Sequence, residues 1–313
     1  MPIDGQRVIE YRGALSLAQL PKRALVIGAG AIGVEFASFW STLGVAVTVV
    51  EFLPRVVPLE DEEVSQHLGR AMSKHGVTIK TGTKVLAVKP SGAATVVELE
   101  KDGAKENVEV DLVLSAAGVQ ANVEGLGLEA LGVKLDRGFI AVDDVTSATN
   151  VKGIYAIGDV AGPPALAHVA SAEAISCVER IAGHNPPPID WDTIPACTFA
   201  HPEIGSVGLT EAAAKAAGKT LKVGRFPFKA LGKARAAGDT DGFVKVIWDA
   251  ADGRLLGAHI IGPGAPDLIA EYALARATEV NAPSLMHTIH AHPTLAEALR
   301  EATEDAYGVS VHL

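Results

Sequence analysis

The stretch Arg23-Ala-Leu-Val-Ile-Gly28-Ala-Gly30-Ala-Ile-Gly33 decides the fold. Residues 23–28 predict a short buried strand, and residues 31–43 predict a helix. Residues 45–51, Val-Ala-Val-Thr-Val-Val-Glu, predict a second strand because they are rich in β-branched side chains. A strand, a helix and a strand in this order predict parallel strands joined by a right-handed crossover. We therefore expect an α/β protein.

The glycines of this stretch have the G-x-G-x-x-G spacing of a dinucleotide-binding turn. Gly28 permits the tight turn, Gly30 lets a pyrophosphate approach the backbone, and Gly33 lets helix and strand pack closely. Glu51 ends the second strand, where a carboxylate accepts a hydrogen bond from the ribose 2′-hydroxyl. Its charge would repel a 2′-phosphate, which favours NAD over NADP, although the nearby Arg55 weakens that preference. The alternative is a glycine-rich turn without a ligand.

Composition and charge bound the class of protein. The chain has 313 residues, enough for two or three domains, and a net charge of -10 that offers no general basic field for nucleic acid. Its apolar runs are too short to span a bilayer, and residues 1–13 show no targeting pattern. Its two cysteines, Cys177 and Cys197, make no disulfide framework, which suits a reducing compartment. We expect a cytoplasmic protein that binds neither membrane nor nucleic acid.

The order of the predicted elements indicates three domains. Residues 1–120 form a Rossmann-type NAD-binding domain that begins with a linker over residues 1–22, residues 121–188 form a central segment, and residues 189–313 form a compact α+β domain. The further strands predicted are 77–80, 84–89, 95–99, 111–118, 153–158, 243–248 and 255–261, and the further helices are 60–75, 166–182, 210–217, 266–277 and 294–306.

Two other segments carry candidate chemistry. Asp159 follows the predicted strand 153–158, where it would accept hydrogen bonds from sugar or ribityl hydroxyls, or act as a helix N-cap or turn aspartate. His292 and Glu297 lie five residues apart at a helix start, as a general base and its orienting carboxylate would. The alternative is structural, because Thr294-Leu-Ala-Glu297 has the pattern of a capping box. The histidines of residues 287–292 are spaced poorly for zinc, so no metal site is expected.

Together these pieces resemble dihydrolipoamide dehydrogenase, the flavin-dependent lipoamide oxidoreductase of the 2-oxo acid dehydrogenase complexes. The resemblance covers nearly the whole chain. It rests on Pro21–Arg23 with Gly28–Glu35, Val49–Arg55, Gly153–Asp159, Leu166–His168, Pro202–Ile204 with Val207–Glu211, Gly232–Arg235 with Asp239–Lys245, and His290–Glu297.

The resemblance implies a role for each matching residue. NAD would be bound by Gly28, Gly30, Gly33 and Glu51, with Glu35 near the nicotinamide, and Gly118 belongs to the cofactor-binding residues. FAD would be contacted by Asp159, Leu166, Ala167 and His168, and the central segment 121–188 would complete an FAD domain. His292 would be the catalytic base that Glu297 orients. Glu35 is explained equally well as an acid in the first turn of a helix. Residues 189–313 would be the interface domain of a homodimer, because the family base acts on the disulfide of the partner subunit. The expected partner is a lipoyl domain of a 2-oxo acid dehydrogenase complex.

The departures from the family pattern decide what the chain does alone. The N-terminal FAD-binding glycine turn and the Cys-x-x-x-x-Cys redox pair are absent, and residues 117–122 read Ala-Gly-Val-Gln-Ala-Asn where many members have Gly-Arg. We therefore expect no turnover without a separate N-terminal half that carries FAD and the disulfide. Without that half, residues 121–188 should expose a large apolar face. The alternatives are a non-catalytic dimeric NAD-binding module and an NADH:acceptor reductase that uses flavin without thiols.

Overall fold

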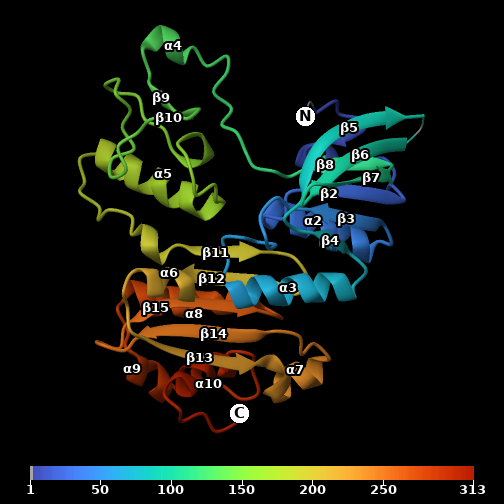
Figure 1. Cartoon of the computed structure of the whole chain (residues 1–313). Helices are drawn as coiled ribbons and strands as arrows, with labels where there is room; N and C mark the ends of the chain where they lie inside the picture. Colours follow the sequence, from blue (N-terminus) through green and yellow to red (C-terminus); the bar gives the residue numbers. More distant parts are fainter. Residues whose placement is uncertain (1–2, 93) are drawn as a thin grey trace. The chain divides into compact units, whose positions relative to one another are not determined.

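The computed structural model describes residues 3–92 and 94–313, which form two compact units. Unit 1 combines the chain up to Gly118 with Pro195–Leu313, and unit 2 is Val119–Ile194 (Figure 1). The parallel sheet and the C-terminal antiparallel sheet thus belong to one unit. No helix in the described ranges is long and apolar enough to cross a membrane.

The N-terminal part of unit 1 is the expected parallel sheet. Its strand order is β1-β8-β2-β3-β4, and every neighbouring pair is parallel. The strands are β1 (Val8–Ile9), β2 (Arg23–Ile27), β3 (Ala46–Val50), β4 (Thr78–Lys80) and β8 (Leu112–Ser115), and the helices are α1 (Tyr11–Leu15), α2 (Ala31–Thr42) and α3 (Glu62–Lys74). The strand–helix–strand prediction is confirmed.

Both faces of this sheet are buried, as an apolar parallel sheet requires. Val26 and Val49 pack with Trp40 of α2 and Leu68 of α3 on one face. On the other face lies a three-stranded antiparallel sheet of β5 (Lys84–Ser91), β6 (Ala94–Lys101) and β7 (Ala104–Val110). The strands predicted at 84–89 and 95–99 are confirmed, whereas β7 was missed because most of its side chains are polar and exposed.

The expected linker over residues 1–22 is partly structured. β1 pairs with β8 and adds a strand to the parallel sheet, and α1 follows it. Val8 and Ile9 are both buried, since each side chain faces one of the two cores of the sheet. A strand of two residues carries too little periodicity to be recognised in a sequence.

Unit 2 corrects the strand predicted at residues 153–158. Residues 153–158 are not a strand but a turn with one bridge, from Tyr155 to Ala148, followed by the 3₁₀ helix η1 (Gly158–Val160). The physical reason is that Gly153 and Gly158 have φ angles of 84° and 69°, which end an extended conformation at both sides. The other elements are α4 (Leu128–Leu131), β9 (Leu135–Asp136), β10 (Phe139–Ile140), α5 (Ala167–Ile181) and η2 (Trp191–Thr193).

The C-terminal part of unit 1 is a five-stranded antiparallel sheet of order β11-β12-β15-β14-β13. α8 packs against β12 and β15, and α10 packs against β13 and β14. The elements are β11 (Pro195–Thr198), β12 (Ile204–Gly208), α6 (Glu211–Ala216), β13 (Leu221–Pro227), η3 (Phe228–Ala230), α7 (Gly232–Ala237), β14 (Phe243–Asp249), β15 (Leu255–Ile261), α8 (Ala265–Ala277), α9 (Ala282–His287) and α10 (Glu297–Ala306). The strands predicted at 243–248 and 255–261 are confirmed. Ile204 and Ile261 belong to the same buried cluster as Trp40, so the two sheets of unit 1 share a core.

Candidate functional site

The glycine turn has the shape that a pyrophosphate site needs. A Cβ on Gly33 would lie 1.9 Å from the carbonyl oxygen of Gly28, and one on Gly28 would lie 2.6 Å from that of Ala116. Both positions therefore exclude any side chain. A Cβ on Gly30 would meet no described heavy atom within 4 Å, so the N-terminus of α2 lies open above it. The unpaired N–H groups of a helix start bind phosphate, and this open approach fits the pyrophosphate of NAD.

Glu51 is placed beside this turn. Its carboxylate is buried and accepts hydrogen bonds from the backbone N–H of Ala29 at 2.7 Å and of Leu53 at 2.8 Å. Each oxygen has two lone pairs, so accepting one backbone hydrogen bond leaves capacity for a ribose hydroxyl. The carboxylate thereby fixes the turn and lies where we expect it to disfavour a 2′-phosphate.

Glu35 has a structural partner that the sequence did not reveal. Its Oε1 accepts a hydrogen bond of 2.8 Å from the backbone N–H of Phe199, at the end of β11. One turn further along α2, the Ser38 hydroxyl accepts a hydrogen bond of 3.0 Å from the N–H of His201. These contacts fasten α2 to the chain that enters the antiparallel sheet, in addition to the nicotinamide contact predicted for Glu35. Gly118 has a φ of 135° and ends the first of the two chain segments that make up unit 1.

His292 and Glu297 are brought together as expected. His292 Nδ1 lies 2.8 Å from Glu297 Oε1, and the other Glu297 oxygen accepts a hydrogen bond of 2.8 Å from the backbone N–H of Thr294. Burial alone would raise the pKa of Glu297, but the hydrogen bonds from Thr294 and His292 outweigh it and hold the pKa below its ordinary value. An ionised carboxylate only accepts, so Nδ1 donates and Nε2 is left as the basic nitrogen. The ring is 77% exposed, which leaves Nε2 open to a substrate.

The capping-box alternative is half right. Thr294 donates its backbone N–H to Glu297, but its hydroxyl donates to the carbonyl oxygen of Ala291 instead of accepting from the helix. α10 begins at Glu297, three residues later than the predicted start at Thr294. Glu297 therefore both closes the turn before α10 and orients His292.

A second histidine–carboxylate pair lies directly before the relay. His290 Nε2 lies 2.8 Å from Oε1 of Glu271 on α8, and the His290 side chain is only 5% exposed. The Glu271 hydrogen bond raises the pKa of His290 above its ordinary value. The pair ties the segment that carries His292 to a long helix. This pair was not predictable from the sequence, because Glu271 is 19 residues away on a different element.

In unit 2, the residues expected to contact FAD gather at one end of α5. Leu166 is the N-cap of this 15-residue helix, and it provides no side-chain hydrogen bond to the first turn in the described structure. Asp159 is exposed on η1, whose N-cap is Ile157, so the N-cap role weighed for Asp159 is wrong. The preceding Gly158 N–H donates to Glu173 of α5 at 2.6 Å, which holds η1 against the helix. The start of a helix is suited to binding a phosphate, and an exposed carboxylate is suited to accepting hydrogen bonds from hydroxyl groups; FAD contains both kinds of group.

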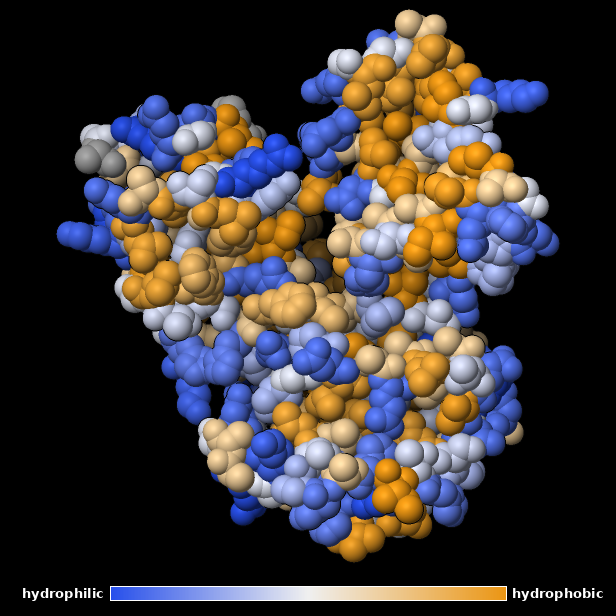
Figure 2. Space-filling view, turned by 180° about the vertical axis from the view of Figure 1, so that it is seen from behind, coloured by the Kyte–Doolittle hydropathy of each residue, from blue (hydrophilic) through white to orange (hydrophobic). Residues whose placement is uncertain are grey.

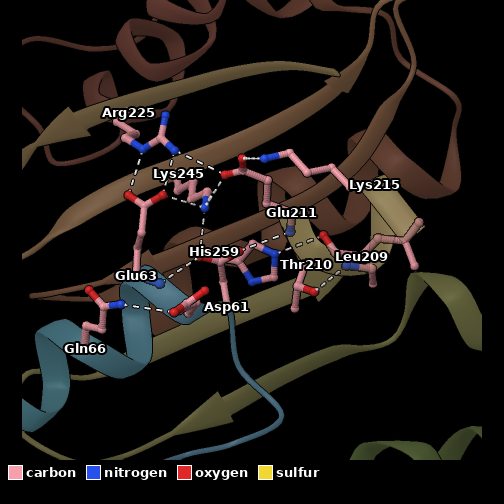
Figure 3. Close-up of polar contacts among 12 residues, drawn as sticks. Asp61, Glu63, Gln66, Leu209, Thr210, Glu211, Lys215, Arg225, Lys245 and His259 are labelled. Carbon is pink, nitrogen blue, oxygen red and sulfur yellow. Dashed lines mark hydrogen bonds and ion pairs between the residues drawn. The ribbon is translucent and has the colours of Figure 1, made fainter. Parts of the chain in front are cut away.

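A buried charge network holds α3 against the antiparallel sheet (Figure 3). Lys245 Nζ contacts Asp61 at 2.8 Å, Glu63 at 2.7 Å and Glu211 at 2.7 Å, and its side chain is 2% exposed. Burial lowers the pKa of Lys245, but the hydrogen bonds to these carboxylates outweigh it and raise the pKa overall. Arg225 adds a paired contact to Glu63, with Nε at 2.7 Å and Nη2 at 2.6 Å. The network fixes the first turn of α3 within unit 1.

Both halves of the sequence match known protein families. Residues 1–174 match the sequence profile of the pyridine nucleotide-disulphide oxidoreductases, and residues 194–303 match that of their dimerisation domain. The chain belongs to the pyridine nucleotide-disulphide oxidoreductase family. The chain is 48% identical to the dihydrolipoyl dehydrogenase of Rhizobium etli over 97% of its own length and 64% of the relative's. It is 42% identical to dihydrolipoyl dehydrogenase 3 of Pseudomonas putida, covering 99% of its own length and 67% of the relative's.

Solved structures agree with this assignment. The chain superposes on LpdA of Mycobacterium tuberculosis with a TM-score of 0.88 and 31% identity, covering 96% of its own length and 65% of LpdA. It superposes on the flavoprotein disulfide reductase RclA of Escherichia coli with a TM-score of 0.89 and 26% identity, covering 97% of its own chain and 68% of RclA. The resemblance to dihydrolipoamide dehydrogenase is thus confirmed. The chain spans 64% to 66% of the length of the first three curated relatives.

Proposed function

We propose that this chain supplies the NAD-binding and interface parts of a dihydrolipoamide dehydrogenase, in which dihydrolipoamide and NAD⁺ become lipoamide, NADH and a released proton. The relay at His292 supports this most directly, because an exposed imidazole oriented by an ionised carboxylate is suited to take a thiol proton. We further propose a homodimer that acts on a lipoyl domain of a 2-oxo acid dehydrogenase complex. Unpaired cysteines favour a cytoplasmic location.

The residues of this chain divide the work of the reaction. His292 Nε2 accepts the proton of one substrate thiol, and the resulting thiolate is the form that attacks a disulfide. Glu297 holds the imidazole in the required tautomer and stabilises its positive charge. The glycine turn and Glu51 hold NAD⁺, while Asp159 and the start of α5 hold FAD. When bound there, FAD would supply the two-electron transfer that links the thiols to NAD⁺.

The cysteine pair that this reaction needs lies outside this chain in our proposal. Cys177 and Cys197 are both free. Cys177 is buried in α5, and burial raises the pKa of the Cys197 thiol, helped by the charge of Glu60. The raised pKa does not favour the reactive thiolate form of Cys197, and burial shields Cys177 from solvent. We therefore propose that the disulfide comes from residues that carry a second glycine turn and a Cys-x-x-x-x-Cys pair.

The surface of unit 2 agrees with such a companion segment. The expected apolar face is present, because Ile175, Val178 and Ile181 of α5 are 64%, 63% and 57% exposed. These residues recur at a spacing of three along one side of the helix. Figure 2 shows hydrophobic side chains gathered over much of this unit. An apolar stripe of this kind is suited to packing against another polypeptide segment.

Complementation tests this proposal. The purified chain is mixed with a polypeptide that carries the glycine turn and the cysteine pair, and NADH formation from dihydrolipoamide is followed with FAD present. We expect turnover only in the mixture. In the mixture, His292→Gln should reduce kcat about 10²- to 10⁴-fold, as loss of a general base does. His287→Gln is the matched control, because His287 is exposed on the neighbouring α9 and should leave kcat unchanged.

Two results would contradict the proposal. Turnover by the purified chain with FAD alone would show that it needs no added disulfide. Full activity of His292→Gln in the complemented mixture would remove the relay from the mechanism. NAD binding without turnover in the mixture would instead favour a non-catalytic module.

A further inference from the structure

Two histidines far apart in the sequence face each other in unit 1. His75 is the C-cap of α3, and His201 lies between β11 and β12. Their ring centroids are 5.4 Å apart, with 40° between the ring planes. Within the described residues, no hydrogen bond or ion pair engages either ring. Each imidazole therefore keeps a nitrogen available for a ligand.

The backbones of both residues are held in place. The N–H of His75 donates to the carbonyl oxygens of Ala71 at 3.0 Å and Met72 at 3.1 Å. The N–H of His201 donates to the Ser38 hydroxyl at 3.0 Å. Because these contacts fix both Cα positions, bringing the rings onto one ligand costs mainly the freedom of their side-chain torsions.

The spacing of the rings fits a metal ion. An ion bonded about 2.1 Å from one nitrogen of each imidazole would lie about 3.2 Å from each ring centre. Ring centres 5.4 Å apart then subtend about 115° at the ion, close to the tetrahedral angle that Zn²⁺ adopts. Without an ion, direct packing of the two rings would contribute only a weak stacking interaction.

The surroundings of the pair are open and of mixed polarity, because Met72 and Val77 also line them. The rings line a cavity of about 330 Å³ together with the hydroxyl-bearing Ser38, Ser41 and Thr42 of α2. Such a cavity accommodates water ligands, and hydroxyl oxygens can accept hydrogen bonds from them. Water has to complete the coordination, because no group of three or more His, Cys, Asp or Glu is placed to hold a metal in the described chain.

We propose that His75 and His201 bind one divalent transition-metal ion of the Zn²⁺, Cu²⁺ or Ni²⁺ class, with water in the remaining positions. The ion links the end of α3 in the dinucleotide-binding part to the loop that enters β12 in the antiparallel sheet. The ion therefore stabilises the contact between these two segments of unit 1 and takes no part in thiol chemistry. Affinity should follow the order of imidazole complexes, with Cu²⁺ binding more tightly than Zn²⁺ or Ni²⁺.

The test is metal titration of the whole chain after treatment with a chelator. Zn²⁺ binding is measured by calorimetry, and Co²⁺ is added as a spectroscopic probe of tetrahedral geometry. We expect one Zn²⁺ per chain and a Tm that rises with Zn²⁺ concentration, since the ion binds the folded state. His75→Gln and His201→Gln should each abolish both effects, whereas the control His287→Gln should keep them.

Folding of the variants is checked by their Tm in the presence of chelator, which should equal that of the parent. Zn²⁺ binding that survives either His75→Gln or His201→Gln would overturn the proposal. Absence of Zn²⁺ binding in the parent chain would overturn it equally. Loss of binding in His287→Gln would place the ion at another histidine and would also refute the assignment.

Discussion

Glu60 offers the sharpest test of the contact between α3 and the antiparallel sheet. It precedes the N-cap of α3 and is 8% exposed. Its Oε1 accepts a hydrogen bond of 3.3 Å from Ser206 of β12, whereas its Oε2 has no hydrogen-bond partner among the described residues. Burial, with a smaller contribution from the charge of Asp61, raises the pKa of Glu60 from 4.5 to about 7.

This shift makes the stability of the fold depend on pH. Because the pKa is higher in the folded state, the stabilising contribution of Glu60 to the free energy of unfolding is fully present below pH 4.5 and is lost as the pH rises through about 7. The whole shift corresponds to about 3 kcal/mol, of which about 2.5 kcal/mol is lost between about pH 5 and pH 8.5. Glu60→Gln keeps the shape and the acceptor for Ser206 but cannot ionise.

The assay is urea unfolding of the parent and of Glu60→Gln at several pH values. We expect the variant to gain about 2.5 kcal/mol relative to the parent between about pH 5 and pH 8.5. Glu62→Gln is the control, because Glu62 is an exposed carboxylate in the first turn of the same helix and should follow the parent. Parallel pH profiles for the parent and Glu60→Gln would refute the reasoning.

Three further predictions concern the turn, the charge network and the second histidine pair. Gly33→Ala should lower the free energy of unfolding by about 1–3 kcal/mol in urea unfolding, because its Cβ would meet a backbone oxygen at 1.9 Å. Gly30→Ala should leave the free energy of unfolding unchanged and weaken NAD binding, which an NAD titration measures. Lys245→Ala should cost about 3–5 kcal/mol in urea unfolding, since it strands buried carboxylates, and an unchanged stability would contradict this. Glu271→Gln should destabilise the chain most below about pH 6.5, because the raised pKa of His290 adds stability that is lost as pH rises through it; equal losses in thermal melts at high and low pH would argue against the pair.

Much of the fold was predictable because its signals are local. The strand, glycine turn and helix of residues 23–42 follow from β-branched runs and from positions where only glycine fits. The pairing of His292 with Glu297 was also predictable, since five residues around a helix start bring their side chains within reach. Strands with polar or very short sequences, β7 and β1, were missed because they lack a clear apolar period.

The turn at residues 153–158 shows how a local pattern can mislead. Its apolar residues suggested a strand, but the glycines at both ends adopt positive φ angles and leave one bridge at Tyr155. The apolar side chains instead fill the small core of unit 2, where Ile154 packs with Ala156 and Val160. Burial alone does not distinguish a strand from a folded turn.

By itself, the sequence determined the dinucleotide-binding turn with its acidic partner and the histidine–carboxylate relay, because each depends on residues within one strand–helix–strand unit or one helix start. Only the tertiary structure decided which distant groups meet: His290 with Glu271, Lys245 with the start of α3, and the buried position of Glu60. These contacts depend on the order in which strands join the sheets and on the packing of helices across them. That order arises from the burial of the whole core, which no short stretch of residues encodes.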